Sequence, residues 1–215
     1  MNTSKTTAQL LLQYGLDLVA EKGLRGLTVR ELAARANVNL GSFVYHFSTR
    51  ERFVTELVEL WYAPMYHELQ KTASSPMPPD IMQKLRVAFT QLLQFFSQNA
   101  PFIAHLLADA AAGEALARAF IMTLPERHPK LLLQLISAAQ IDGCIIREPP
   151  IHLLMFIMGS AGVPMLLVQG MLHDKSWLPA EAMRLTQLMQ DPAAAQLRLQ
   201  WALRGISTTP GDLPC

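Results

Sequence analysis

The stretch from Thr28 to Phe47, TVRELAARANVNLGSFVYHF, constrains the fold more than any other part of the sequence. Thr28 is followed three residues later by Glu31, which is the spacing of a capping box at the start of a helix. Apolar residues then recur at helical spacing as far as Ala36, while the charged residues fall on other faces. We therefore expect a short helix that begins at Thr28 and ends near Ala36.

A second short helix is predicted after a sharp turn. Asn37 tolerates the left-handed backbone that such a turn requires, and Asn39 is a suitable N-cap for a helix over Leu40–Tyr45. Phe43 and Phe47 are spaced to anchor the inner side of this helix, so its small first residues face outward. Two helices joined by a tight turn, with the second helix presented outward, are typical of proteins that read the DNA major groove.

Helices are also expected on both sides of this motif. An apolar stripe from Ala8 to Val19 predicts a supporting helix that ends at Gly23, a residue suited to a helix C-cap. Ser48 with Glu51 has the spacing of another capping box, and the helix it starts should be kinked or ended by Pro64.

The charge of the chain is concentrated near the motif. The net charge of the 215 residues is only +1, so overall basicity does not indicate a nucleic-acid-binding protein. Between residues 25 and 52, however, five arginines face only two glutamates. Hydrophobic residues make up 51% of the chain and charged residues 16%, a balance that favours self-association or ligand binding.

The motif resembles the N-terminal region of the TetR family of transcriptional repressors. The residues that carry the resemblance are Leu32-Ala33, Ala36-Asn37-Val38, Gly41-Ser42-Phe43, His46-Phe47, and Arg50-Glu51 before Phe53. Asn37 stands where the family usually has Gly, and Val44 stands where it usually has a phosphate-contacting Tyr. Tyr45 either takes over that contact or the contact is lost. The resemblance covers about the first quarter of the chain.

The resemblance implies an all-α chain with an N-terminal three-helix helix-turn-helix DNA-binding unit and a helical C-terminal ligand-binding and dimerisation domain. We expect residues 1–48 to be the DNA-binding domain, 49–71 a connecting helix, 72–80 a linker, 81–206 the effector-binding and dimerisation domain, and 207–215 a flexible tail. The expected DNA-binding residues are Thr28, Arg30, Asn39, Leu40, Gly41, Ser42, Val44, Tyr45, His46 and Arg50.

The C-terminal part contains one stretch, Ile151–Leu172, that is apolar and about as long as a bilayer span. Glycines and a proline interrupt it and no second span exists, so a buried or dimer-facing helix is the preferred interpretation. We expect homodimerisation through 151–172 and 192–204, with Gly159, Ala161 and Gly162 allowing backbones to approach closely. A strong helix is expected to begin after the N-cap Asp80 and to close at 99–101. Loops and shorter helices fill the rest of this part, and no strand-like alternation occurs.

Catalytic and metal sites do not assemble from the sequence spacing. No nucleophile, base and oxyanion site come together, the six histidines are scattered, and no Gly-rich phosphate loop is present, so no enzyme activity, metal or cofactor is expected. Cys144 is interpreted as a small buried thiol. Two cysteines and an N-terminus without an apolar signal core favour a reducing cytoplasm.

Methionine and phenylalanine side chains are abundant in the C-terminal part. Ordinary core filling explains each of them singly, but together they suit a pocket for an apolar or aromatic small molecule. The candidate ligand-binding residues are Met65, Tyr66, Phe89, Phe96, Phe102, His105, Met122, Met155 and Phe156.

The sequence thus predicts a TetR-like DNA-binding transcriptional regulator, a repressor released from its operator by a small apolar or aromatic effector. Its partners are operator DNA, a second copy of the chain and an unidentified effector, with no membrane. One alternative is a helical small-molecule or lipid-binding protein, or an enzyme, without specific DNA binding. Another is a DNA-binding activator or nucleoid-type protein without a ligand.

Overall fold

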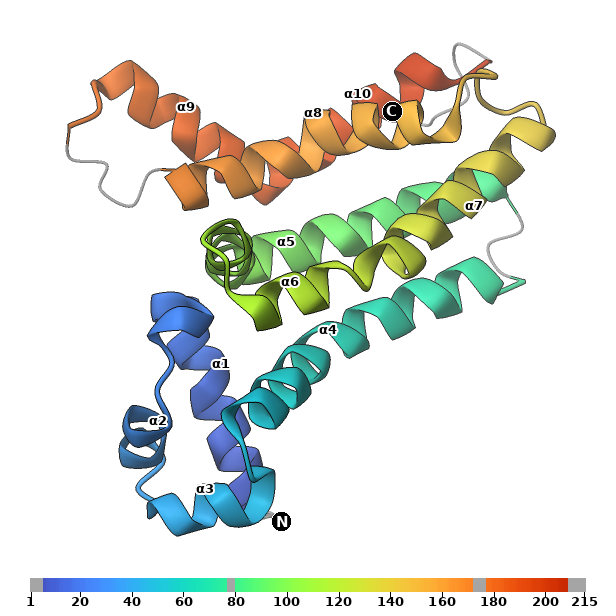
Figure 1. The fold of residues 1–215 in the computed structure, drawn as a ribbon. Coiled ribbons are helices and arrows are strands. Elements are labelled where there is room, and N and C mark those ends of the chain that lie inside the picture. Colours follow the sequence, from blue (N-terminus) through green and yellow to red (C-terminus); the bar gives the residue numbers. More distant parts are fainter. Residues whose placement is uncertain (1–5, 77–79, 172–176, 209–215) are drawn as a thin grey trace, which may run out of the picture. The chain divides into compact units, whose positions relative to one another are not determined.

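The computed structural model describes residues 6–76, 80–171 and 177–208. Within these ranges the regular structure is helical, as the sequence predicts, apart from an isolated β-bridge between Ile145 and Ser207. The helices follow the chain as shown in Figure 1: α1 (Thr7–Gly26), α2 (Val29–Arg35), α3 (Leu40–Phe47), α4 (Arg50–Ser74), α5 (Ile81–Ala111), α6 (Ala115–Ile121), the 3-10 turn η1 (Leu124–Glu126), α7 (His128–Ile141), α8 (Pro150–Met171), α9 (Ala180–Gln190) and α10 (Pro192–Ile206).

The chain forms two compact units that are not contiguous in sequence. Unit 1 comprises Met1–Pro64 and Pro101–Thr123, and unit 2 comprises Met65–Ala100 and Leu124–Cys215. The units therefore divide the chain differently from the sequence-based boundaries, because residues 101–123 belong with the N-terminal helices. Helices α4 and α5 each contribute to both units, and each passes from one to the other at a proline, Pro64 or Pro101.

The helix boundaries differ from the expectations at three places. Helix α4 does not end at Pro64 but continues to Ser74, because buried Met65 and Leu69 stabilise the turns that follow the proline. Helix α5 has a kink where its end was expected at 99–101, since Asn99 leaves helical geometry (φ −122°, ψ 16°), but it then runs on to Ala111. Helix α9 was not predicted, and it begins without a side-chain capping hydrogen bond. Residues 77–79 of the expected linker and 209–215 of the expected tail lie outside the described residues.

Unit 1 has an aromatic core behind the helix-turn-helix motif. The rings of Phe43, Phe47 and Phe53 are buried, with centroid separations of 5.6, 5.4 and 4.9 Å. A Cβ atom on Gly15 would lie 2.7 Å from Cζ of Phe53, so glycine is needed where α1 approaches this cluster. Helices α1, α2 and α3 pack against one another around it. The core therefore holds α3 by its inner side.

Unit 2 is built around α8, which packs against α7, α9 and α10. Gly162 faces inward, since a Cβ atom there would lie 3.3 Å from the ring of Phe96 on α5. Thr90 on α5 donates a hydrogen bond to Gln196 on α10 at 3.0 Å. Among the described residues, one helical segment, Pro150–Val168, is long and apolar enough to cross a membrane by length and composition alone, and 39% of it is buried.

Candidate nucleic-acid interface

Helix α2 begins as the sequence predicts but with half of the expected capping box. The Thr28 hydroxyl accepts a hydrogen bond from the Glu31 backbone N–H at 3.3 Å. The Glu31 carboxylate does not return to the N-cap, because Lys22 Nζ on α1 binds it at 2.5 Å and Arg35 approaches it at 3.7 Å. The Glu31 carboxylate therefore pairs with Lys22 and Arg35 and makes no hydrogen bond to the backbone N–H of Thr28.

The turn between α2 and α3 has the predicted left-handed residue. Asn37 adopts φ 53°, and the Val38 N–H donates to the Ala33 carbonyl at 3.0 Å. Asn39 then caps α3, since its Oδ1 accepts hydrogen bonds from the Ser42 backbone N–H at 2.8 Å and from the Ser42 hydroxyl at 3.1 Å. The turn and both helix starts are therefore fixed by local hydrogen bonds.

A second turn ends α3 and begins α4. Ser48 has φ 63° and acts as the C-cap of α3, so it does not begin a capping box with Glu51 as expected. Thr49 takes that role one residue later, and its hydroxyl accepts from the Arg52 N–H at 3.2 Å. The left-handed residue turns the chain so sharply that the next helix starts immediately.

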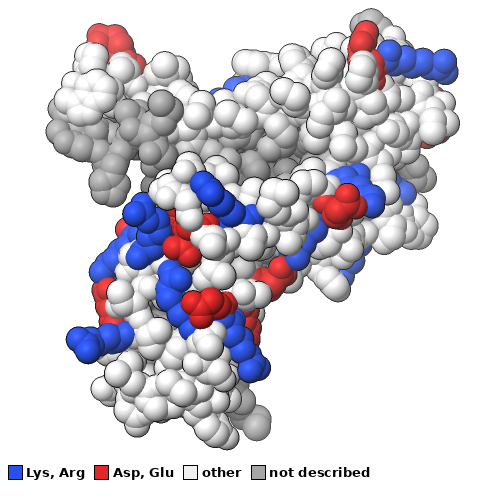
Figure 2. All heavy atoms as spheres, in the orientation of Figure 1, with Lys and Arg blue, Asp and Glu red and all other residues white. Residues whose placement is uncertain are grey.

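The outer surface of α3 is exposed and carries no Asp, Glu, Lys or Arg side chain. The side chains of Leu40, Val44 and Tyr45 are 48%, 57% and 83% exposed, and the Tyr45 ring contacts His46 edge-on at 5.0 Å. In Figure 2 charged side chains of both signs gather over α1 and α2, whereas the end of unit 1 that holds α3 shows none on this face. Leu40 and Val44 therefore give the exposed surface of α3 an apolar part.

Arginines on α2 and α4 precede and follow α3 in the chain. Arg35 is occupied by Glu21, with hydrogen bonds of 2.7 and 2.6 Å that lower the pKa of the Glu21 carboxyl. Arg30 on α2 and Arg52 on α4 are exposed and form no ion pair among the described residues. Arg52 was not among the expected DNA-binding residues, although its position close to Arg50, just after the motif, favours the same role.

Arg50 differs from the other predicted DNA-binding residues because its guanidinium is turned into unit 1. It donates to the carbonyl oxygens of Leu24 and Leu27 at the end of α1, and its Nη1 lies 3.6 Å from a carboxylate oxygen of Glu114. These contacts fix the start of α4 against α1. A contact between Arg50 and DNA remains a prediction, and it is the one that the structure supports least.

The predicted ligand-binding residues are divided between the two units. Phe102 in unit 1 stacks on Trp61, with ring centroids 4.2 Å apart, while Met122 of the same unit is 76% exposed. In unit 2, Met65 and Phe89 are buried in the core, whereas Met155 and Phe156 lie exposed on α8. His105 belongs to unit 1, and Tyr66 and Phe96 belong to unit 2.

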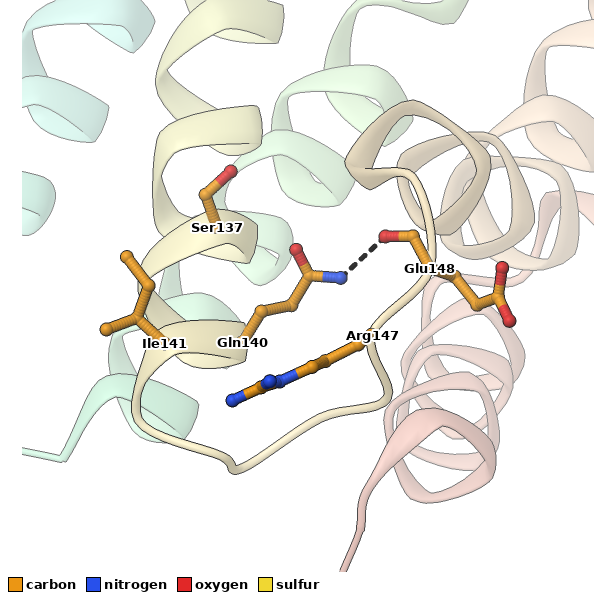
Figure 3. Close-up of a pocket in the computed structure, with 5 residues that line it drawn as sticks. All are labelled: Ser137, Gln140, Ile141, Arg147 and Glu148. Carbon is orange, nitrogen blue, oxygen red and sulfur yellow. Dashed lines mark hydrogen bonds between the residues drawn. The ribbon is translucent and has the colours of Figure 1, made fainter.

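A different pocket, of about 420 Å³, opens on unit 2 near the end of α7. The Gln140 side-chain amide donates to the carbonyl oxygen of Glu148 at 2.6 Å (Figure 3). It also donates to the carbonyl oxygen of Ile146 at 3.0 Å. The lining residues are Ser137, Gln140, Ile141, Arg147 and Glu148. None of the predicted ligand-binding residues lines this pocket. No cluster of three metal-ligating side chains occurs in the described part of the chain.

The geometry of α2 and α3, held by the aromatic cluster of unit 1, is that of a helix-turn-helix motif. Residues 11–57 match the family described as "Bacterial regulatory proteins, tetR family". The repressor KstR2 of Mycolicibacterium smegmatis is 34% identical over 70 residues, which are 31% of this chain and 34% of that protein. The repressor DhaR of Mycobacterium sp. is 22% identical over 140 residues, covering 65% and 70% of the two chains.

Solved structures extend the likeness to the whole fold. The ketosteroid transcriptional regulator KstR2 of Mycobacterium tuberculosis superposes with a TM-score of 0.68 at 18% identity, over 96% of this chain and 98% of that one. A TetR transcription regulator from Haloarcula marismortui gives 0.68 at 12% identity, over 94% and 98%. The family match thus covers residues 11–57, and the solved structures show that the whole chain shares their fold. The aligned segment spans about a third of the KstR2 sequence.

Proposed function

We propose that this protein is a transcriptional repressor that binds operator DNA as a homodimer and is released by a small apolar effector. The observation that carries the proposal is α3, an exposed helix seated on a rigid aromatic cluster directly after a helix-turn-helix turn. Such a helix enters the major groove with its first residues against the base edges.

Phosphate contacts come from the groups that surround α3. Arg30 and Arg52 supply free guanidinium groups, while Tyr45 and His46 supply hydrogen-bonding groups on α3 itself. Thr28 and the NH₂ group of Asn39 lie at the two helix N-termini, where backbone amides favour phosphate. These contacts fix the register of the protein on the duplex, and they make binding dependent on salt.

The dimer forms through the outer faces of α8 and α10. Exposed apolar side chains follow one another along these two packed helices: Ile151, Met155, Phe156, Val163, Leu167, Leu197 and Trp201. A contiguous apolar surface of this kind on a regulator favours a partner, and a second copy gives a symmetric, self-complementary contact. Gly159 is open on this surface, but Ala161 and Gly162 are buried within unit 2, so only Gly159 serves close approach there.

Effector release operates through the helices shared by both units. An effector that binds unit 2 and prefers another arrangement of α4 or α5 weakens DNA binding by its differential affinity for the two states. Pro64 and Pro101 lack a backbone N–H, so both shared helices have a missing hydrogen bond where they change unit. KstR2 is described as a ketosteroid regulator, which supports an apolar effector here.

The test is an anisotropy titration of the dimeric protein with duplexes enriched from a random library. A thermal-shift panel of steroids, fatty acids and aromatic acids then identifies an effector. Calorimetric titration of that effector with and without the duplex should show affinities that differ by about 5–150-fold. Failure to enrich any duplex would refute the proposal that the protein is a DNA-binding regulator. Equal effector affinities with and without the duplex would refute only the release mechanism.

The alternative of a helical ligand carrier without specific DNA binding receives no comparable support. Its candidate pocket residues are divided between the two units, and several are exposed. Enrichment of a specific duplex would exclude it.

A further inference from the structure

Helix α3 lacks the side chains that most often read bases through hydrogen bonds. In the major groove, Arg or Lys pairs with guanine, Asn or Gln with adenine, and Asp or Glu with cytosine. The sequence of α3, LGSFVYHF, contains none of these six residue types. If α3 is the reading helix, most of its specificity must come from another kind of contact.

The N-cap residue Asn39 does not supply the missing contact. Bidentate recognition of adenine needs both the oxygen and the nitrogen of a carboxamide. Oδ1 of Asn39 already accepts two hydrogen bonds from Ser42, so only its NH₂ group remains to contact DNA. The Ser42 hydroxyl is likewise engaged as a donor. Both side chains are therefore committed to holding the start of α3.

What α3 does present is an apolar strip. Leu40 and Val44 are one helical turn apart, so they lie on the same face, and they are 48% and 57% exposed. Gly41 is exposed between them and brings no side chain to hold the helix away from the groove. The apolar group that a base pair offers in the major groove is the C5-methyl group of thymine.

We infer that Leu40 and Val44 select the operator by contact with thymine methyl groups in each half-site. The inference rests on the proposed function, since it requires α3 to enter the groove. Thymine and cytosine share a similar shape, but only thymine carries the methyl group, so an apolar strip distinguishes the two without a hydrogen bond. The resulting half-site contains thymines at the positions that face the start of α3.

The experiment starts with the full-length protein and a random-sequence duplex library. The enriched duplex is then synthesised with single thymines replaced by deoxyuridine, which keeps the base pair and removes only the C5-methyl group. Each contacted methyl should cost about threefold to fivefold in affinity, the value of one buried apolar carbon. In Leu40→Ala and Val44→Ala proteins, different single positions should lose this sensitivity.

Leu60→Ala is the matched control, because Leu60 is a leucine of unit 1 with the same 48% exposure on a different helix. This variant should keep the full response to deoxyuridine. Wild-type affinity unchanged by every replacement would overturn the inference while specific DNA binding stands. Full sensitivity in both the Leu40 and the Val44 variants would also overturn it, by assigning the contact elsewhere. Failure to enrich any duplex would instead refute the proposed function itself.

Discussion

The carboxylate of Asp109 accepts a hydrogen bond of 2.6 Å from the backbone N–H of Leu24, a residue 85 positions earlier in the chain. The contact lies where α1 departs from helical geometry at Gly23 (φ 76°), and the N–H of Arg25 also points to Asp109 at 3.4 Å. Asp109 is only 7% exposed. Its buried charge is thus compensated by amides that the break in α1 releases.

Asp109→Ala should lower the free energy of unfolding by about 1.5–3 kcal/mol, because the change leaves a buried N–H without its charged acceptor. Urea denaturation followed by circular dichroism measures the loss. Asp17→Ala removes an exposed carboxylate from α1 and should change stability by less than about 0.5 kcal/mol. If the two substitutions lowered the free energy of unfolding equally, the hydrogen bonds of Asp109 would add nothing to the effect of removing a carboxylate.

Gly41→Glu should reduce operator affinity by about a hundredfold or more, because a carboxylate at the exposed start of α3 meets the negative potential of the duplex. Fluorescence anisotropy measures the affinity, and a thermal melt establishes that the variant is folded. Ala119→Glu adds the same charge at an exposed position on α6 and should bind nearly as the wild type does. Unchanged binding by the Gly41 variant would remove this residue from the interface.

Gly159→Arg should convert the dimer to a monomer, since it places a charge in the apolar surface of α8 where no described residue comes within 4 Å of an added Cβ atom. Sedimentation velocity at micromolar concentration gives the mass, and DNA affinity should fall with it. Gln94→Arg adds the same side chain to an exposed site on α5 and should remain dimeric. If the Gly159 variant sedimented as a dimer, the proposed interface on α8 and α10 would be incorrect.

Burial lowers the pKa of His128 to about 4, so the imidazole is neutral in the folded protein at pH 5, whereas the unfolded chain binds a proton with a pKa near 6.5. The unfolded state therefore holds more protons between these values, and stability must fall as pH decreases from 6.5 towards 4. Between pH 7 and pH 5, His128→Gln should lose about 2 kcal/mol less than the wild type in urea unfolding. If the wild type and the variant lost equal stability between pH 7 and pH 5, the lowered pKa of His128 would be contradicted.

The sequence could predict the helix-turn-helix motif because local rules determine it. The Thr28 cap, the left-handed Asn37 and the inward Phe43 each depend on residues a few positions away. The inward turn of Arg50 could not be predicted, because it depends on Glu114 and on carbonyl groups at the end of α1.

Long-range packing also explains the errors in the helix boundaries. A proline costs a helix one hydrogen bond, but the burial of Leu69 in the turns beyond Pro64 compensates for that loss. Helix α9 gave little signal, since it has one fully buried residue, Thr186, and no side-chain cap at Pro179. The pocket residues were chosen by composition, and composition does not reveal that Met155 and Phe156 point to solvent.

The second segment of unit 1, residues 101–123, limits how this protein can exchange parts with its relatives. A gene fusion that joined residues 1–64 to a foreign sensor would remove the carboxylates of Asp109 and Glu114 from the polar groups at the end of α1 and from Arg50. A functional chimaera must carry two separate pieces of sequence, with junctions at both prolines. New sensing specificities in this lineage should therefore arise by point substitution within unit 2 more readily than by recombination at a single breakpoint.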